Sequence, residues 1–213
     1  MSPKVSPFGS WQSPISAEMV GSSALGLGDV IVDGDTIYWL ESRPAEKGRT
    51  VLVCLDKSGK THDVTGAEFN VRNAVHEMGG AAAIISDGHV YFSNYSDHRV
   101  YKQTLSGSQD DAGSMDGRSG ADPLSPALLM VPNPAQALSK PGPYRYADFC
   151  QDKKRNRLIL VKEDHSEPGM EPLNTLDVLP LDGEHEAEML LAGSDFFSTP
   201  RVSPDGRLLC WLT

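Results

Sequence analysis

The sequence contains no apolar run near the ~20 residues of a membrane-spanning helix, and its N-terminus (MSPKVSPFGSWQSPIS) lacks the apolar core of a secretory signal. Positive charge is also scarce, with 19 Lys and Arg against 29 Asp and Glu and a formal net charge of −10. Because binding to phosphate requires clustered Lys and Arg, this balance argues against nucleic acid and anionic membranes. We therefore expect no nucleic-acid partner and no membrane partner.

Cysteine is rare as well. Cys54, Cys150 and Cys210 are odd in number, far apart in the sequence, and each lies in a segment that we predict to be a strand. This pattern favours buried free thiols over a disulfide framework or a zinc site, as is typical of a reducing compartment. The expected location is the cytoplasm.

Recognisable catalytic motifs are missing. The nucleophile elbow Gly-x-Ser-x-Gly does not occur, and its nearest approach is Gly117–Gly120. His76-Glu77 does not begin a zinc-protease motif, because the second histidine would stand at the position of Gly80. Long amphipathic helical segments are absent too, which argues against an α/β fold with crossover helices. We predict no catalytic residue, no metal site and no cofactor in this chain.

What the sequence does contain is a unit that recurs four times: an apolar strand, a tight turn of Asp-Gly type, and a second β-rich strand. The turn aspartates lie 54, 65 and 53 residues apart and are Asp33, Asp87, Asp152 and Asp205. A period near fifty residues with paired strands inside each repeat is typical of a β-propeller. The expected fold is all-β: an incomplete propeller of about three and a half four-stranded blades, with no α/β-hydrolase domain.

The repeats also predict the domain boundaries. Residues 1–27 form an N-terminal extension and residues 28–213 a partial propeller. Its predicted parts are blade one (28–66), blade two (75–131), blade three (144–192) and the start of blade four (196–213). A polar, acidic stretch at 106–126 reads as a disordered insertion, after which Ala127–Val131 resumes blade two as its outer strand. The aromatic residues after the turns are expected in the core between blades: Trp39, Tyr91, Phe92 and Trp211.

Five residues are candidates for contacts along a channel or with a neighbouring domain. His76 and Glu77 enter the first strand of blade two and would line the axis, or Glu77 would satisfy backbone N–H groups while Gly79-Gly80 permits close packing. Glu163 and His165 end a strand at a blade rim, where they would face a partner or form a structural hydrogen-bond cluster. Arg72 lies between blades one and two and could pair with a carboxylate there, or merely with solvent. For the two pairs we favour the structural interpretation.

Several segments, taken together and in order, resemble a known family. They are Phe8–Ser16, Ile37–Glu41, Phe69–Arg72, Val75–Gly80, Val90–Asn94, Arg145–Asp148, Glu163–His165 and Ser203–Gly206. The set is similar to the N-terminal half of prolyl oligopeptidase family peptidases, above all the acylaminoacyl-peptidase or dipeptidyl-aminopeptidase-like branch. The Ser-Pro-Asp-Gly turn alone is less specific, since TolB-type propellers share it. Met78 departs from the pattern, because an aromatic residue is expected at that position.

The resemblance implies a propeller, usually of seven blades, that caps a C-terminal α/β-hydrolase domain with a Ser-Asp-His triad and admits only short peptides. No catalytic residue carries over to this chain, because no position corresponds to one. The resemblance thus implies the substrate-gating, domain-capping part of a serine exopeptidase or oligopeptidase, inactive alone. Its partners would be the missing C-terminal hydrolase domain or remaining blades, with short peptides as substrates of the parent enzyme.

Two other hypotheses remain. The chain could be a stand-alone, propeller-like protein-binding module without enzyme activity, or an independent hydrolase, which would need catalytic machinery that the sequence does not show. An open arc of blades would expose sheet edges and apolar faces that a closed ring covers. We therefore expect the isolated chain to be marginally stable, to aggregate, or to associate with a partner or with itself.

Overall fold

The computed structural model describes residues 5–10, 13–21, 25–105 and 133–213. Strands account for nearly all of its regular structure, and the helical segments among the described residues are α1 (Ala17–Gly21) and two 3-10 helices, Pro44–Glu46 and Lys153–Arg155. The predicted insertion at 106–126 and the predicted strand Ala127–Val131 lie outside the described residues. No described helix is both long and apolar enough to cross a membrane.

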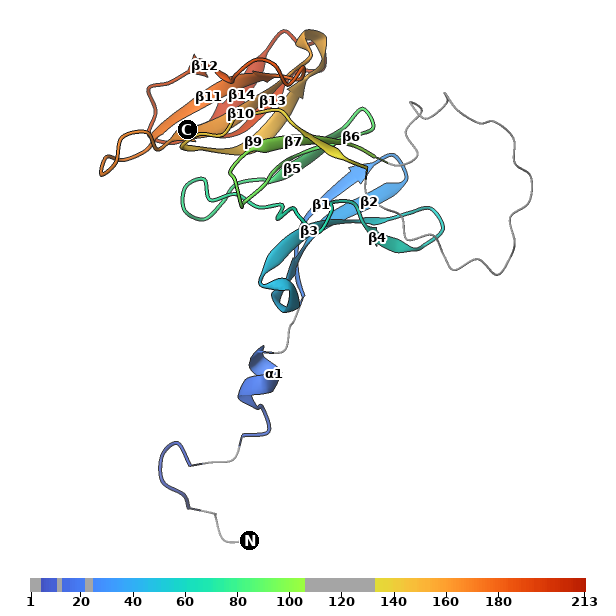
Figure 1. Ribbon diagram of the computed structural model, residues 1–213, viewed down its shortest axis with the longest axis vertical. Coiled ribbons are helices and arrows are strands. Elements are labelled where there is room, and N and C mark those ends of the chain that lie inside the picture. The colour runs from blue at the N-terminus through green and yellow to red at the C-terminus, as the bar shows by residue number, and fades with distance from the viewer. Residues whose placement is uncertain (1–4, 11–12, 22–24, 106–132) are drawn as a thin grey trace, which may run out of the picture.

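The strands form three four-stranded antiparallel sheets and one two-stranded sheet. Within each sheet they follow one another in sequence order (Figure 1): β1 (Gly26–Asp33), β2 (Thr36–Arg43), β3 (Arg49–Leu55) and β4 (Thr61–Asp63); β5 (Ala83–Ser86), β6 (His89–Ser93), β7 (Val100–Thr104) and β8 (Ala135–Ala137); β9 (Tyr144–Asp152), β10 (Arg157–Asp164), β11 (Leu173–Pro180) and β12 (Glu188–Leu191); and β13 (Ser198–Val202) with β14 (Leu209–Leu212).

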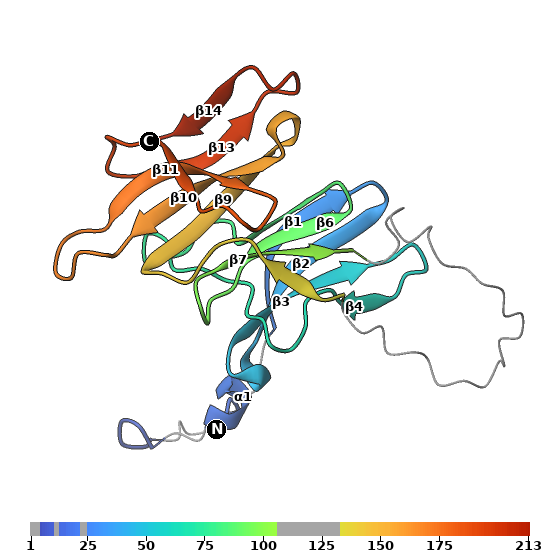
Figure 2. The same cartoon turned by 45° about the horizontal axis from the view of Figure 1, so that its top comes forward.

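The first strands of successive sheets lie beside one another, β1 by β5, β5 by β9 and β9 by β13. The sheets therefore radiate from a common axis, as the turned view shows (Figure 2), and each sheet is one blade of a propeller. The predicted all-β, incomplete propeller is confirmed: three complete blades and two strands of a fourth, with no closed ring among the described residues. In blade two the outer strand is β8, later in the sequence than the predicted end of that blade at residue 131.

Local sequence explains the hairpins within the blades. At the tip of β5–β6, Ser86 pairs with His89, so the connection is the two residues Asp87 and Gly88. Their φ angles are +51° and +71°. A two-residue hairpin turn with positive φ at both positions matches the twist of the strands, and Asp-Gly is among the sequences that adopt it readily. This turn sets the pairing of β5 with β6, whereas β9 and β10 are joined through the 3-10 helix Lys153–Arg155.

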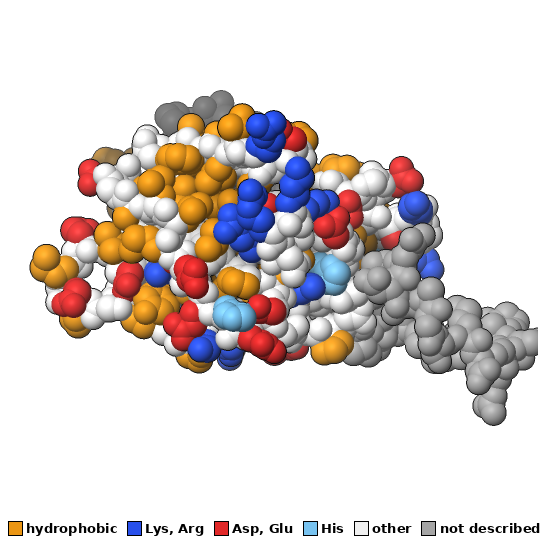
Figure 3. All heavy atoms as spheres, turned by 90° about the horizontal axis from the view of Figure 1, so that it is seen from above, with side chains coloured by type: hydrophobic (Ala, Val, Ile, Leu, Met, Phe, Trp, Pro, Cys, Tyr) orange, Lys and Arg blue, Asp and Glu red, His pale blue; other side chains and the backbone are white. Residues whose placement is uncertain are grey.

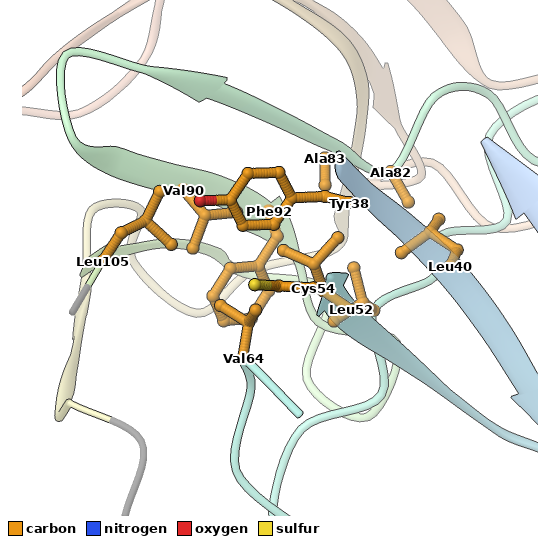
Figure 4. Packing of buried hydrophobic residues seen from close by; sticks show 11 residues of the cluster. Tyr38, Leu40, Leu52, Cys54, Val64, Ala82, Ala83, Val90, Phe92 and Leu105 are labelled. Carbon is orange, nitrogen blue, oxygen red and sulfur yellow. The ribbon is translucent and has the colours of Figure 1, made fainter. Parts of the chain in front are cut away.

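The core lies between the blades rather than within any one of them. One cluster of buried side chains joins blades one and two around Leu52, Val71, Val90 and Phe92 (Figure 4). A second joins blades two and three, and a third, with Val75, Ala147, Val161, Leu176 and Phe197, continues toward blade four. Each blade is consequently stabilised by its neighbours, as in other repeat architectures.

Burial of the aromatic residues follows this arrangement. Tyr91 and Phe92 are buried between blades, as predicted. The prediction is wrong for Trp39, which is half-buried, and for Trp211, which is 37% exposed. Trp39 pairs with Val30 across β1–β2, on the face opposite Tyr38 and Ile31. That face has no neighbouring sheet among the described residues, so alternation along the strand leaves Trp39 outside the core.

The cysteines also differ in burial, according to whether a neighbouring sheet covers the face of the strand on which they lie. All three are free and lie in strands, as predicted. Cys54 is buried and Cys150 half-buried, whereas Cys210 is exposed on β14, which corrects the prediction that it is buried.

Viewed from above, over blades three and four, hydrophobic side chains gather on an exposed area of the surface (Figure 3). The exposed apolar residues of these two blades are Met170, Leu173, Met189, Leu190, Phe196, Leu208, Trp211 and Leu212.

Candidate functional site

An axial groove of about 610 Å³ runs along the first strands of the blades. We call it the axial groove; its wall includes residues 26–29 of β1, residues 78–82 leading into β5, Asp148 of β9 and Thr199 of β13. Because every blade contributes to this wall, the groove is a property of the whole arc and not of one sheet.

Asp148 joins three blades at the groove. Its Oδ1 accepts a hydrogen bond from the backbone N–H of Ala81 at 2.7 Å, and its Oδ2 accepts one from the N–H of Thr199 at 2.9 Å. The side chain also explains the glycine at position 80, since a β-carbon there would lie 2.7 Å from Asp148 Oδ1. A buried carboxylate that accepts two backbone N–H groups is a charge-assisted clamp between neighbouring inner strands.

The backbone at Asp148 is unusual and recurs. Asp148 has a φ of +56° at a bulge in β9, and Asp29 and Thr199 have positive φ at bulges in β1 and β13. Asp29 and Asp148 each stand four residues before a turn aspartate, a spacing that two of the four repeats contain. Bulges of this kind re-aim a side chain, here toward the axis of the propeller.

A second group of polar residues surrounds Glu163, whose side chain is almost completely buried. Its Oε1 accepts a hydrogen bond from the backbone N–H of His76 at 2.6 Å. Its Oε2 lies 3.1 Å from Nε2 of His165 and 3.8 Å from Nη1 of Arg145. The carboxylate thus has partners on both oxygens, which a buried charge requires.

Arg145 and Asn174 extend this group, which we call the Glu163 cluster. Nη1 of Arg145 donates to the carbonyl of Ala74 at 2.9 Å and to Glu77 Oε1 at 3.2 Å. Nε2 of His76 lies 2.9 Å from Oδ1 of Asn174. The cluster is therefore a junction between the segment that enters blade two and the first three strands of blade three, β9, β10 and β11.

The structure brings four of the five candidate residues together: His76, Glu77, Glu163 and His165 belong to the Glu163 cluster. Arg72 lies apart, with its guanidinium 5.1 Å from the ring centroid of Tyr95, and it also lines the axial groove. Tyr95 is in turn a ring neighbour of His98. Burial and the charge of Arg145 lower the pKa of His98 below its ordinary value. Arg145, Asn174 and Asp148 were not singled out from the sequence.

The hydrogen bonds of Asp148 and Glu163 join segments that belong to different blades. In the described part of the chain, no Ser or Cys side chain is hydrogen-bonded to a histidine. Nor do the described residues include a group of three or more His, Cys, Asp or Glu side chains placed to hold a metal ion. The charged side chains in the wall of the axial groove are Asp29, Asp148 and Arg72, whereas the imidazoles of His76 and His165 belong to the Glu163 cluster.

Together the radial blades and the axial groove define a β-propeller. No family model matches the sequence, and no curated protein is significantly similar to it. Solved structures are similar. A puromycin-hydrolyzing peptidase of Mycobacterium tuberculosis aligns at 29% identity over 98% of this chain and 31% of its own, with a TM-score of 0.73. A puromycin hydrolase aligns at 27% identity over 98% of this chain and 31% of its own, with a TM-score of 0.75.

Two further solved structures are also similar to this chain. A puromycin hydrolase mutant complexed with PGG aligns at 26% identity over 97% of this chain and 30% of its own, with a TM-score of 0.75. A TolB protein of Agrobacterium tumefaciens, at 13% identity and a TM-score of 0.50, shares the fold alone. The chain matches an N-terminal propeller portion of peptidases of the prolyl oligopeptidase family, as the sequence resemblance predicted. It spans about a third of the length of the peptidases it matches.

Proposed function

We propose that this chain is the substrate-gating, domain-capping propeller part of a serine peptidase that hydrolyses short peptides. The observation that carries the proposal is the match to three peptidase structures over 97–98% of this chain but only 30–31% of theirs. On this proposal the catalytic serine lies in a part of the polypeptide that these 213 residues do not include. The chain by itself is then inactive.

The axial groove supports a gating role. Every blade contributes to its wall, so its width is set by how the inner strands sit against one another. In this proposal the groove is the passage for short peptides, and Asp148 fixes its width by joining three blades. Folded proteins are excluded because they cannot enter a passage of this size.

The proposed partners are a C-terminal α/β-hydrolase domain and the remaining blades. Exposed apolar residues at both ends of the arc support this: Leu27, Val30 and Val32 on β1, and Leu208, Trp211 and Leu212 around β14. Apolar sheet faces of this kind are normally covered by the next blade. We further propose that the parent peptidase belongs to the acylaminoacyl-peptidase or dipeptidyl-aminopeptidase-like branch and acts in the cytoplasm.

The nucleotide sequence directly after codon 213 tests the proposal. We expect an open frame with further repeats of about fifty residues, followed by a Gly-x-Ser-x-Gly motif. A stop codon at that point in the transcript would contradict the proposal. It would favour the alternative of a stand-alone binding module whose exposed apolar faces bind other proteins.

A further inference from the structure

The segment that enters blade two is a closed lobe tied at its base. We call residues Ala74–Gly79 the flap. Oδ1 of Asn73 accepts hydrogen bonds from the N–H groups of Val75 at 3.2 Å and Gly80 at 3.0 Å, and its Nδ2 donates to the carbonyl of Gly80 at 3.0 Å. One buried side chain therefore holds both ends of the flap together and forms a hinge.

The flap itself has an unfavourable backbone. His76 and Glu77 are consecutive non-glycine residues with φ of +54° and +62°. Residues with a β-carbon adopt this left-handed region at a cost, so the conformation persists only where the surroundings enforce it. Within the flap, hydrogen bonds join Met78 N–H to the His76 carbonyl at 2.7 Å and Gly79 N–H to the Val75 carbonyl at 2.8 Å.

Blade three supplies the enforcing contacts. Glu163 accepts from the His76 N–H, and Arg145 donates to the carbonyl of Ala74 and to Glu77. We call Glu163 and Arg145 the latch. His76 is held additionally by Asn174 and by an edge-to-face contact with Phe196, with ring centroids 5.0 Å apart.

The far side of the flap lines the axial groove. Met78 is 89% exposed, and Met78, Gly79 and Gly80 are part of the groove wall. The flap thus lies between the latch on one side and the groove on the other, with its hinge at Asn73. Val75, at the base of the flap, is buried in the third cluster and stays in place. A movement of His76–Gly79 away from blade three would change the groove without disturbing that cluster.

We propose that the flap is a movable wall of the axial groove, which the latch on blade three holds in its strained position. Release of the latch lets the flap swing on Asn73 and opens the groove to larger molecules. This inference rests on the proposed function in so far as the groove is a passage for short peptides. The flap and the latch both lie within the propeller, so their movement requires no catalytic domain.

Amide hydrogen exchange of the 213-residue chain tests the latch. In Glu163→Ala the amides of residues 76–79 are expected to exchange about tenfold faster or more, because the acceptor of the His76 N–H is lost. Asp152→Ala is the matched control, since Asp152 is also a buried carboxylate of blade three that is paired with arginines, Arg155 and Arg157. In this control, any increase in the exchange of the flap amides is expected to be no greater than the increase in the rest of the chain.

Glu77→Gln keeps the test valid if Glu163→Ala does not fold. Glu77 is exposed, and its substitution removes only an ion pair with Arg145, so we expect a smaller increase confined to the flap. Unchanged flap exchange in both variants, or an increase spread evenly over the chain, would overturn the proposal.

A cysteine in the groove wall tests the opening. In Ala82→Cys, at a buried position of the groove wall, the rate of reaction with a bulky maleimide is compared with that of the exposed Cys210 in the same molecule. The ratio is expected to rise severalfold when Glu163→Ala is added and to stay constant with Asp152→Ala; a constant ratio in both would refute the gating role of the flap. These measurements need no hydrolase activity, so a stop codon after residue 213 would remove the proposed function and leave them intact.

Discussion

Replacing Phe92 by alanine is expected to lower the free energy of unfolding by about 3–5 kcal/mol, the usual cost of removing a fully buried aromatic ring. Phe92 is completely buried between blades one and two. Its ring packs edge-to-face on Phe69 and stacks on Tyr101, with centroids 5.2 and 5.6 Å away. The loss is large because the cavity would lie in the interface that joins two blades, and neither sheet can collapse into it without moving as a unit.

Urea denaturation of the purified chain, followed by circular dichroism, measures this effect. Phe8→Ala is the matched control, because it makes the same chemical change at a fully exposed ring. The control is expected to stay within about 0.5 kcal/mol of the parent chain. A cost below about 1 kcal/mol for Phe92→Ala would mean that the cluster between blades one and two does not hold the arc together.

Replacing Asp148 by alanine is expected to cost about 3 kcal/mol of unfolding free energy. The substitution removes a charged acceptor from the N–H groups of Ala81 and Thr199, at 2.7 and 2.9 Å, and leaves both donors without that partner. It also places alanine at a φ of +56°, which aspartate tolerates better. The loss of the acceptor and the strain at positive φ both destabilise the folded chain.

Three variants separate these contributions in the same denaturation experiment. Asp148→Asn keeps a side chain that tolerates positive φ and retains one acceptor oxygen, so its cost is expected to be intermediate. Asp148→Gly removes the acceptor but also removes the strain of a positive φ, because glycine has no β-carbon. Asp29→Ala is the matched control, since Asp29 stands at the corresponding bulge with positive φ but is exposed. If Asp29→Ala cost as much as Asp148→Ala, the clamp between blades would not explain the effect.

The fold could be predicted because its signal is local. Each hairpin depends on a turn such as Asp87-Gly88 and on alternation within two short strands, and the recurrence of that unit defines the propeller. Burial was harder to predict, because it depends on which sheet lies next to a given face. Trp39 and Trp211 follow their turns much as Tyr91 and Phe92 do, yet their faces have no neighbouring blade among the described residues.

The candidate site could be predicted in part. The sequence predicts His76 and Glu163 as separate candidates, from their chemistry and their position at strand ends, and the structure joins them although they are 87 residues apart. Arg145 and Asn174 could not be predicted as members of the cluster, because arginine and asparagine near the ends of strands are ordinarily surface residues. Contacts between blades carry no short-range sequence signal. Which residues pair across two blades is therefore visible only in the three-dimensional structure.

Labelling with a fluorophosphonate, which reacts with the activated serine of serine hydrolases, tests the central claim most directly. The native polypeptide would be captured from its source cells with an antibody raised against these 213 residues. We predict a labelled polypeptide about three times as long as this chain, as the matched peptidases are, and no labelling of the purified 213-residue chain. Capture of an unlabelled polypeptide of 213 residues, or labelling of a serine within this chain, would contradict the account.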